Sequence, residues 1–163
     1  MKVKMAVVLA CLMSSLSASA SIAAVETTAL SMVPRGVLIA KIAREYFVKT
    51  LAGTKIKVEF GHDGKFEEAS GMNLNHGDEF EPGMGLISLG TAARAVVSIG
   101  YQVKGDWNLE KDSTHGWVYE MAGENNEEEI FHLVNATSGH FIGSIAEKAP
   151  QEFPGGTKLA GRN

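Results

Sequence analysis

The sequence predicts an α+β fold in which helices pack on antiparallel sheet, arranged as two successive helix-plus-hairpin units. Apolar residues recur every three or four positions in two segments and alternate with polar residues in others, and glycine-containing turns separate these segments. The chain has 163 residues, of which 45% are hydrophobic and 21% charged. This length and composition are those of a globular protein with one domain or two very small ones.

Residues 1–20 have the order of regions that marks a cleavable secretory signal. Lys2 and Lys4 precede an apolar run over residues 5–13, and small residues follow as far as Ala20. The apolar run is too short to span a bilayer, so no transmembrane segment is expected after cleavage. A buried N-terminal helix is the alternative interpretation. We expect the protein to be periplasmic or secreted.

Cleavage after Ala20 changes the chemistry of the mature chain. It removes the one cysteine, Cys11, so the mature chain cannot form a disulfide. The apolar stretch before Cys11 is very short for a lipidation signal, so soluble export is favoured over lipid anchoring. Loss of Lys2 and Lys4 leaves 13 basic against 19 acidic residues, a formal charge of −6. Such an acidic chain is a poor nucleic-acid binder.

The first unit is predicted to be a helix between Pro34 and Gly53 followed by a hairpin. In the helix, Leu38, Ile42 and Tyr46 lie four positions apart, with Pro34 near the start and Gly53 just after the end. In the hairpin, apolar and charged residues alternate over residues 55–60, and a Gly-His-Asp-Gly turn permits a tight reversal. A connector rich in acidic residues completes the unit, which we place at residues 21–87.

The second unit, residues 88–147, is predicted to begin with a helix that Ser88 caps and Gly100 ends. Strands are expected near residues 102–111, 116–121, 128–134 and 140–145, and a flexible tail over residues 148–163. The helix stripe and one strand face are expected to pack together; they comprise Leu89, Ala92, Val96 and Ile99 from the helix, and Trp117, Tyr119 and Met121 from the strand.

The end of this unit contains a turn motif, Val134-Asn135-Ala136-Thr137-Ser138-Gly139. The Asn135 and Ser138 side chains can accept from nearby backbone amides, and Gly139 can take a left-handed conformation, so the motif is predicted to close a hairpin as a structural turn. With the apolar residues that follow, it is similar to the V-D-A-x-T-G pattern of PepSY domains, with Asn135 in place of the Asp and Ser138 in place of the Thr.

Residues 88–144 therefore resemble a PepSY domain, and residues 34–71 are interpreted as a divergent second copy. The resemblance implies a secreted module of one helix on an antiparallel sheet, without enzymatic activity or a cofactor. It also implies an inhibitory or regulatory role toward an envelope or secreted protein, with a peptidase as one candidate partner.

The connector contains the one candidate cation site, a group of oxygen and nitrogen donors. Its spacing fails the calcium-loop template, because position six from Asn73 is Asp78 and position twelve is Met84. A solvated connector is the simpler interpretation, and a small-ligand or metal-binding periplasmic protein is the alternative function. The weak metal candidates are His76, Asp78, Glu79 and Glu81, beside Asn73 and Asn75.

Motifs for enzymatic chemistry are missing from the sequence. The histidines never have H-x-x-x-H or H-E-x-x-H spacing, although His132 and His140 could approach each other across the terminal hairpin. No G-x-S-x-G or phosphate-loop pattern occurs. The acidic run Glu124 with Glu127–Glu129 is interpreted as a solvated turn, or as a docking patch for a basic partner. We therefore expect a protein that is not an enzyme.

Overall fold

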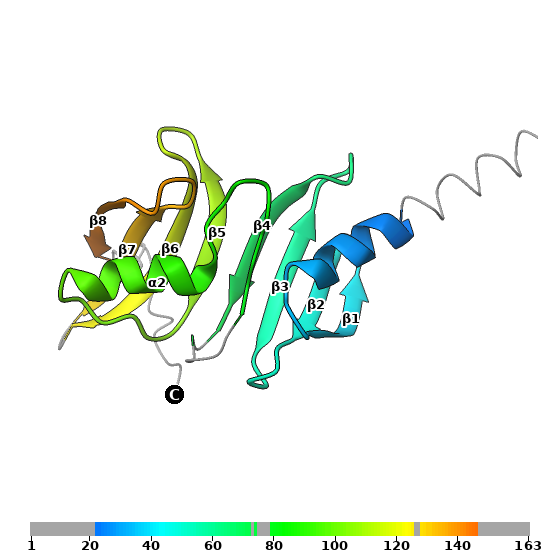
Figure 1. Ribbon diagram of the computed structural model, residues 1–163, viewed down its shortest axis with the longest axis horizontal. Coiled ribbons are helices and arrows are strands. Elements are labelled where there is room, and N and C mark those ends of the chain that lie inside the picture. Colours follow the sequence, from blue (N-terminus) through cyan, green and yellow to red (C-terminus); the bar gives the residue numbers. More distant parts are fainter. Residues whose placement is uncertain (1–21, 73, 75–78, 126–127, 147–163) are drawn as a thin grey trace, which may run out of the picture.

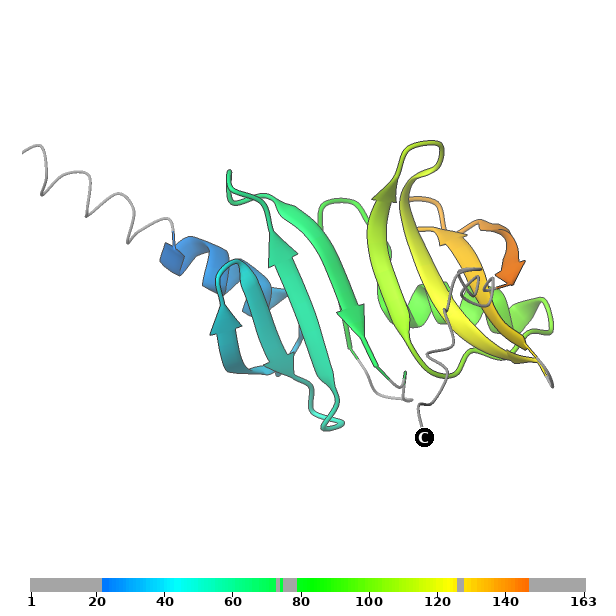
Figure 2. The same ribbon diagram turned by 180° about the vertical axis from the view of Figure 1, so that it is seen from behind.

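One eight-stranded antiparallel sheet dominates the protein, in a computed structural model that describes residues 22–72, 74, 79–125 and 128–146 (Figure 1). The strands lie in the order in which they occur in the chain, so each pairs with its sequence neighbours. Both described helices lie on the same face of the sheet (Figure 1), and no described helix or strand covers the opposite face, which we call the open face (Figure 2).

The predicted fold class, α+β with two PepSY-like units of a helix packed on its own hairpin, is wrong. The fold is sheet-dominated, because the strands of both predicted units join in one continuous sheet and the helices are short. The physical reason is that β4 and β5 pair with each other across the boundary between the units. Among the described residues, no helix is long and apolar enough to cross a membrane.

The first half of the sheet follows a helix whose described part is residues 22–31. The strands are β1 (Val37–Ile42), β2 (Glu45–Lys49), β3 (Lys55–Phe60) and β4 (Phe66–Gly71). The helix predicted between Pro34 and Gly53 is therefore wrong. The chain reverses between β1 and β2 instead, at Ala43, which has a left-handed φ of 52°. The predicted alternation in β3 is confirmed, with Ile56, Val58 and Phe60 buried.

The second half begins with α2 (Leu89–Ser98), where the predicted helix is confirmed. Ser88 Oγ accepts from the Thr91 amide at 3.3 Å, as an N-cap does. Leu89, Ala92 and Val96 are buried, but Ile99, which was expected in the same stripe, is 49% exposed. The strands are β5 (Trp107–Asp112), β6 (Gly116–Asn125), β7 (Glu128–Asn135) and β8 (Phe141–Ala146).

The apolar core lies between the sheet and the helices. On β6 the expected facing is correct: Tyr119 and Met121 are fully buried, and Trp117 is half-buried and stacked on Phe66 with ring centroids 5.1 Å apart. The Tyr119 hydroxyl donates to the Ile87 carbonyl at 2.9 Å, so this strand is tied to the segment that leads into α2.

The join between the two halves is short. β4 and β5 are paired only through Ala69 with Leu109, Ser70 with Asn108, and Gly71 with Trp107. A Cβ at Gly71 would lie 2.5 Å from the Trp107 Nε1 atom, so only glycine leaves room for this indole.

Candidate interaction surface

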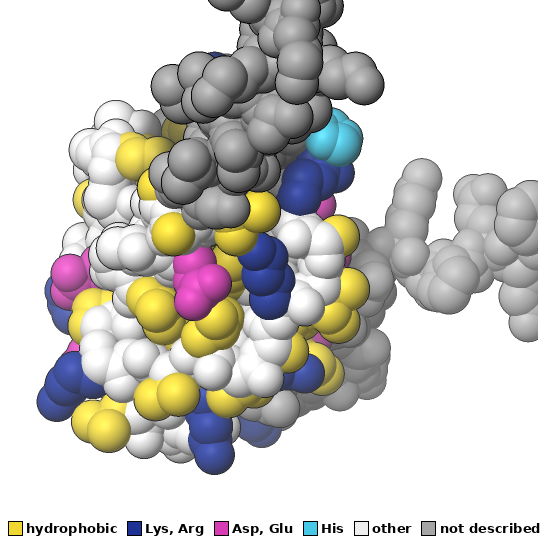
Figure 3. All heavy atoms as spheres, turned by 90° about the vertical axis from the view of Figure 1, so that its right-hand side faces the viewer, with side chains coloured by type: hydrophobic (Ala, Val, Ile, Leu, Met, Phe, Trp, Pro, Cys, Tyr) yellow, Lys and Arg dark blue, Asp and Glu magenta, His cyan; other side chains and the backbone are white. Residues whose placement is uncertain are grey.

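The outer edge of β1 carries several exposed apolar side chains. β1 is a terminal strand of the sheet, so among the described strands it pairs only with β2. Three of its six side chains are large aliphatic groups that are more than half exposed: Val37 at 62%, Ile39 at 51% and Ile42 at 60%. Figure 3 shows this side of the molecule, where apolar side chains lie among basic and acidic side chains.

The strand register decides which face these side chains share. Val37 pairs with Lys49 and Ile42 with Glu45, which places both on the open face together with Phe47 of β2. A bulge between Leu38 and Ala40 interrupts the pairing around Ile39. The edge of β1 therefore presents aliphatic groups beside backbone that has no partner strand within the described chain.

Lysines surround this apolar edge. Lys41 lies over the Tyr46 ring at 5.1 Å, and Lys55 lies over the Phe47 ring at 5.5 Å. Lys49 is exposed at the end of β2. The sequence of β1, VLIAKI, contains no acidic residue. The surface around the edge therefore combines apolar groups with several lysines, and Glu45 is the acidic residue opposite Ile42.

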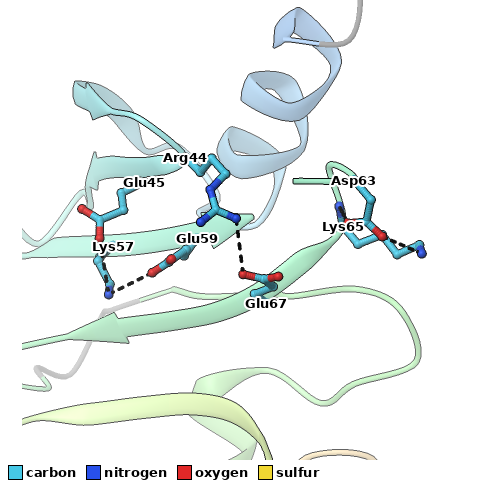
Figure 4. A network of polar contacts seen from close by, with 7 residues as sticks. All are labelled: Arg44, Glu45, Lys57, Glu59, Asp63, Lys65 and Glu67. Carbon is cyan, nitrogen blue, oxygen red and sulfur yellow. Dashed lines mark hydrogen bonds and ion pairs between the residues drawn. The ribbon is translucent and has the colours of Figure 1, made fainter. Parts of the chain in front are cut away.

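The centre of the open face in the first half carries a charge network around Lys57 (Figure 4). Its ammonium lies 3.2 Å from Glu68, 3.4 Å from Glu59 and 4.0 Å from Glu45. Burial alone would lower the pKa of Lys57, but the hydrogen bonds and charges of Glu68 and Glu59 outweigh it and raise the pKa. These side chains are only a quarter to about a third exposed, so the network is a fixed part of the sheet surface.

The second half of the open face has acidic residues near Glu120 of β6. Partial burial is the main cause that raises the pKa of Glu120, and the negative charges of Glu110 and Asp112 add to it. The Asn108 Oδ1 atom beside it is buried and has no hydrogen-bond partner among the residues that the structure describes. Asp112 has the opposite shift, because amides of His115 and Thr114 donate to it and lower its pKa.

The expected cation site is only partly within the described residues. Asn73, Asn75, His76 and Asp78 lie outside them. Glu79 pairs with Arg35 at 2.5 Å, and the Glu81 side chain is exposed. In the ranges that the structure describes, no three His, Cys, Asp or Glu side chains are grouped so that they could hold a metal ion.

His132 and His140 do not face each other across the terminal hairpin. His132 pairs with Ser144 on β8, and its Nδ1 atom lies 2.8 Å from the Ser144 Oγ atom. Its ring stacks on Tyr101 at 4.7 Å, and burial lowers its pKa, which favours the neutral form. The amide of Asn135 donates to the His140 carbonyl. His132 is thus held as a structural residue between β8 and the segment after α2.

The terminal turn has the geometry of a backbone reversal. The Asn135 Oδ1 atom accepts from the amides of Thr137 at 3.0 Å and Ser138 at 2.9 Å. Ser138 Oγ accepts from the His140 amide at 3.3 Å, and Gly139 has a φ of 74°. The Asn135 Nδ2 atom also donates to the His115 carbonyl at 3.0 Å, so the turn is fixed both internally and to the loop between β5 and β6.

Comparison with family models, with curated proteins and with solved structures finds no match to this chain. The evidence on function is therefore the surface itself. The β1 residues were missed as surface groups because this segment was predicted to be a helix, with Leu38 and Ile42 in its apolar stripe. Their high content of β-branched residues, Val37, Ile39 and Ile42, was the available signal for a strand.

Proposed function

We propose that this chain is an exported, non-enzymatic binding or regulatory module that adds an extended strand of another envelope or secreted protein to the edge of β1. The observation that carries the proposal is the row of exposed aliphatic side chains, Val37, Ile39 and Ile42, on a terminal strand. The PepSY resemblance of residues 88–144 supports a peptidase as the class of partner.

Strand addition fits the chemistry of this edge. A terminal strand offers a row of backbone donors and acceptors, and a partner strand would pair them and cover the aliphatic groups on the open face. Natural sheets blunt such edges with bulges and lysines, and β1 has one of each, a bulge at Ile39 and Lys41. These features weaken nonspecific pairing but leave Val37 and Ile42 exposed at the two ends of the strand.

The charges favour a different protein over a second copy of this chain. Neither β1 (VLIAKI) nor the opposite edge strand β8 (FIGSIA) contains an acidic residue. Pairing of either edge with β1 of another copy would therefore leave Lys41 without a carboxylate on the added strand. The partner strand is expected to alternate apolar residues with Asp or Glu, because this pattern complements both Ile42 and Lys41.

The test begins with capture of the mature chain's partner from an envelope extract and continues with the purified partner. Ile42→Lys should weaken binding by at least about tenfold, because strand addition would desolvate the new ammonium. Val97→Lys is the matched control: Val97 is 57% exposed on α2, on the opposite side of the sheet. Neither substitution should lower the thermal stability, because both positions are solvent-exposed.

Two further readouts decide the outcome. Amides of residues 37–42 should gain protection from hydrogen exchange when the partner binds, since a new strand would pair with them. Peptide and ester substrate panels should show no turnover. Equal loss of binding in both lysine variants, unchanged exchange in β1, or hydrolysis by the purified chain would each contradict the proposal.

The alternative, a periplasmic metal-binding protein that uses the connector, has no support among the described residues, where Glu79 is already paired with Arg35. Micromolar binding of a divalent metal that disappears when Asp78, Glu79 and Glu81 are replaced by Ala would favour it.

A further inference from the structure

A groove of about 540 Å³ opens on the helix-covered side of the sheet. Small-molecule sites typically have volumes of about 300–1,000 Å³, so the groove has room for such a ligand. Its lining comes from the end of the helix at residues 22–31, from β3 to β6, and from the segment before α2. It is distinct from the β1 edge and does not depend on the function proposed for that edge.

Five of the twelve residues that line the groove have aromatic or sulfur-containing side chains. Phe60 and Phe66 meet edge to face with centroids 6.3 Å apart, and Trp117 stacks on Phe66 at 5.1 Å. Met32 is buried beside them, whereas Met84 is 58% exposed. The wall is therefore rigid on its aromatic side and adaptable on its methionine side, a combination suited to an apolar ligand of irregular shape.

Two lysines, Lys65 and Lys111, are among the described residues that line the groove, and one of them has no ion pair within the described chain. Lys65 is paired with Asp63 at 2.7 Å, and Glu67 lies 4.0 Å from Arg44 (Figure 4). Lys111 is exposed and forms neither an ion pair nor a hydrogen bond with the rest of the described chain. It pairs in register with Trp117, on the same strand face as the buried Leu109. The Lys111 ammonium thus lies beside an aromatic wall, and none of the described residues acts as its counter-ion.

The backbone at the mouth of the groove is held in an unusual conformation. Gly83, Met84 and Gly85 have left-handed φ values of 69°, 55° and 74°. Glycine adopts this conformation freely, but for methionine it costs about 1–2 kcal/mol. The segment therefore keeps an exposed methionine at the groove, although a glycine at this position would be less strained.

We infer that this groove binds an amphiphilic carboxylate of the fatty-acid type. The hydrocarbon chain would lie along Phe66, Trp117 and Met84, and the carboxylate would pair with the Lys111 ammonium. The apolar wall accounts for the hydrocarbon chain, and Lys111, which has no ion pair within the described chain, accounts for the sign of the charged end.

Trp117 provides a direct readout, because it is part of the wall. The intact chain is titrated with ω-bromododecanoic acid below its micelle concentration, and quenching of tryptophan fluorescence by the bromine reports contact. Dodecanol and dodecyltrimethylammonium compete as neutral and cationic probes. We expect saturable quenching that dodecanoate reverses well, dodecanol reverses poorly, and the cation does not reverse.

Four variants define the site. Lys111→Met should weaken dodecanoate binding about threefold to fivefold, the range of an exposed ion pair, and leave dodecanol unchanged. Met84→Gly removes a side chain from the groove wall, so it should weaken binding of both probes. Because it also relieves backbone strain, it should not lower the melting temperature. Trp117→Phe should remove most of the quenching. Lys49→Met, outside the groove, should change nothing.

Three results would overturn the inference. The first is absence of saturable quenching in the folded wild-type chain. The second is equal competition by dodecanol, which would show a nonspecific apolar contact without carboxylate recognition. The third is an equal effect of Lys111→Met and Lys49→Met, which would show that the affinity depends on net charge and not on this lysine.

Discussion

Replacement of Tyr119 by alanine is expected to lower the free energy of unfolding by about 3–5 kcal/mol, the range for large aromatic truncations in a core. The Tyr119 side chain is fully buried, and its ring lies 6.3 Å from that of Trp107. Its hydroxyl also donates to the Ile87 carbonyl at 2.9 Å. The substitution therefore removes a core ring and a tie between β6 and the segment before α2.

A second variant, Tyr119→Phe, separates these two contributions. It keeps the ring and removes only the hydrogen bond, so it should cost about 1 kcal/mol. The difference between the two variants, about 2–4 kcal/mol, then measures the packing of the ring. Tyr101→Ala is the control for loss of an aromatic side chain at a position that is 47% exposed, and it should cost less than Tyr119→Ala.

Tyr119 also makes the stability depend on pH in the alkaline range. Burial raises the pKa of its phenol in the folded protein well above the ordinary value of 10.0. The unfolded chain therefore loses this proton first, and the stability that the neutral phenol contributes is present below pH 10 and lost as the pH rises through the folded-state pKa. Tyr119→Phe should weaken this alkaline decline.

Urea denaturation at neutral pH, followed by circular dichroism, measures each free energy. A cost below about 1 kcal/mol for Tyr119→Ala would refute the packing described for β6, because a ring in the core cannot be removed at the cost of a surface substitution. An alkaline decline of the same size in wild type and Tyr119→Phe would refute the assigned origin of the pH dependence.

Three other predictions follow from single features. Gly139→Val should cost more than about 1 kcal/mol in the same denaturation assay, since a β-branched residue is strained at a φ of 74°. Glu120→Gln should stabilise the protein at pH 7 by less than about 1 kcal/mol in view of solvent screening. Partial burial and the negative charges of Glu110 and Asp112 raise the folded-state pKa of Glu120, so the stability that its protonated form contributes is lost as the pH rises. The gain from Glu120→Gln should therefore vanish below pH 4.5, where the carboxyl is protonated in the folded and unfolded states. Intact-mass measurement of exported protein should give a mature chain that begins at Ser21, and a mass that retains Met1 or a lipidated Cys11 would contradict the predicted signal.

The elements predicted correctly are those with local signals at both ends. The helix α2 begins with a capping serine at Ser88 and is followed by Gly100 with a φ of 95°, and both signals can be read in the sequence. In β3, strict alternation and the glycine turn after it indicate a strand without reference to the rest of the chain. Local chemistry was sufficient in these cases because it agrees with the tertiary fold.

The hairpin of β1 and β2 could not be recognised in the same way. Its reversal at Ala43 and Arg44 contains no Gly, Pro, Asn or Asp, although Ala43 has a left-handed φ of 52°. Residues four apart share a face of a helix, and Leu38, Ile42 and Tyr46 fit that pattern. In the structure Tyr46 is buried but Ile42 is 60% exposed, because the turn between them places Ile42 on the open face of the sheet and Tyr46 on the helix-covered face.

The continuous sheet and the groove depend on pairing between distant segments. Gly71 and Trp107 are paired although 36 positions separate their numbers, and neither residue alone indicates the other. The groove likewise combines Met32, Phe66, Met84 and Trp117 from separate elements. Periodicity identifies such elements but does not say which of them become neighbours, so neither the groove nor the joined sheet was predicted.

The short join between β4 and β5 has a consequence for how the protein assembles. Each half of the sheet is built from hairpins between sequence neighbours, so each can form at a low entropic cost of loop closure, whereas the join must close the long segment from Gly71 to Trp107. We expect it to form last and to separate first under mechanical load, with the halves extending in two steps. Single-molecule pulling at the chain ends tests this, and a single extension step of the whole sheet would show that the three residue pairs couple the halves fully. In that case Gly71 and Trp107 would make the two halves one cooperative unit.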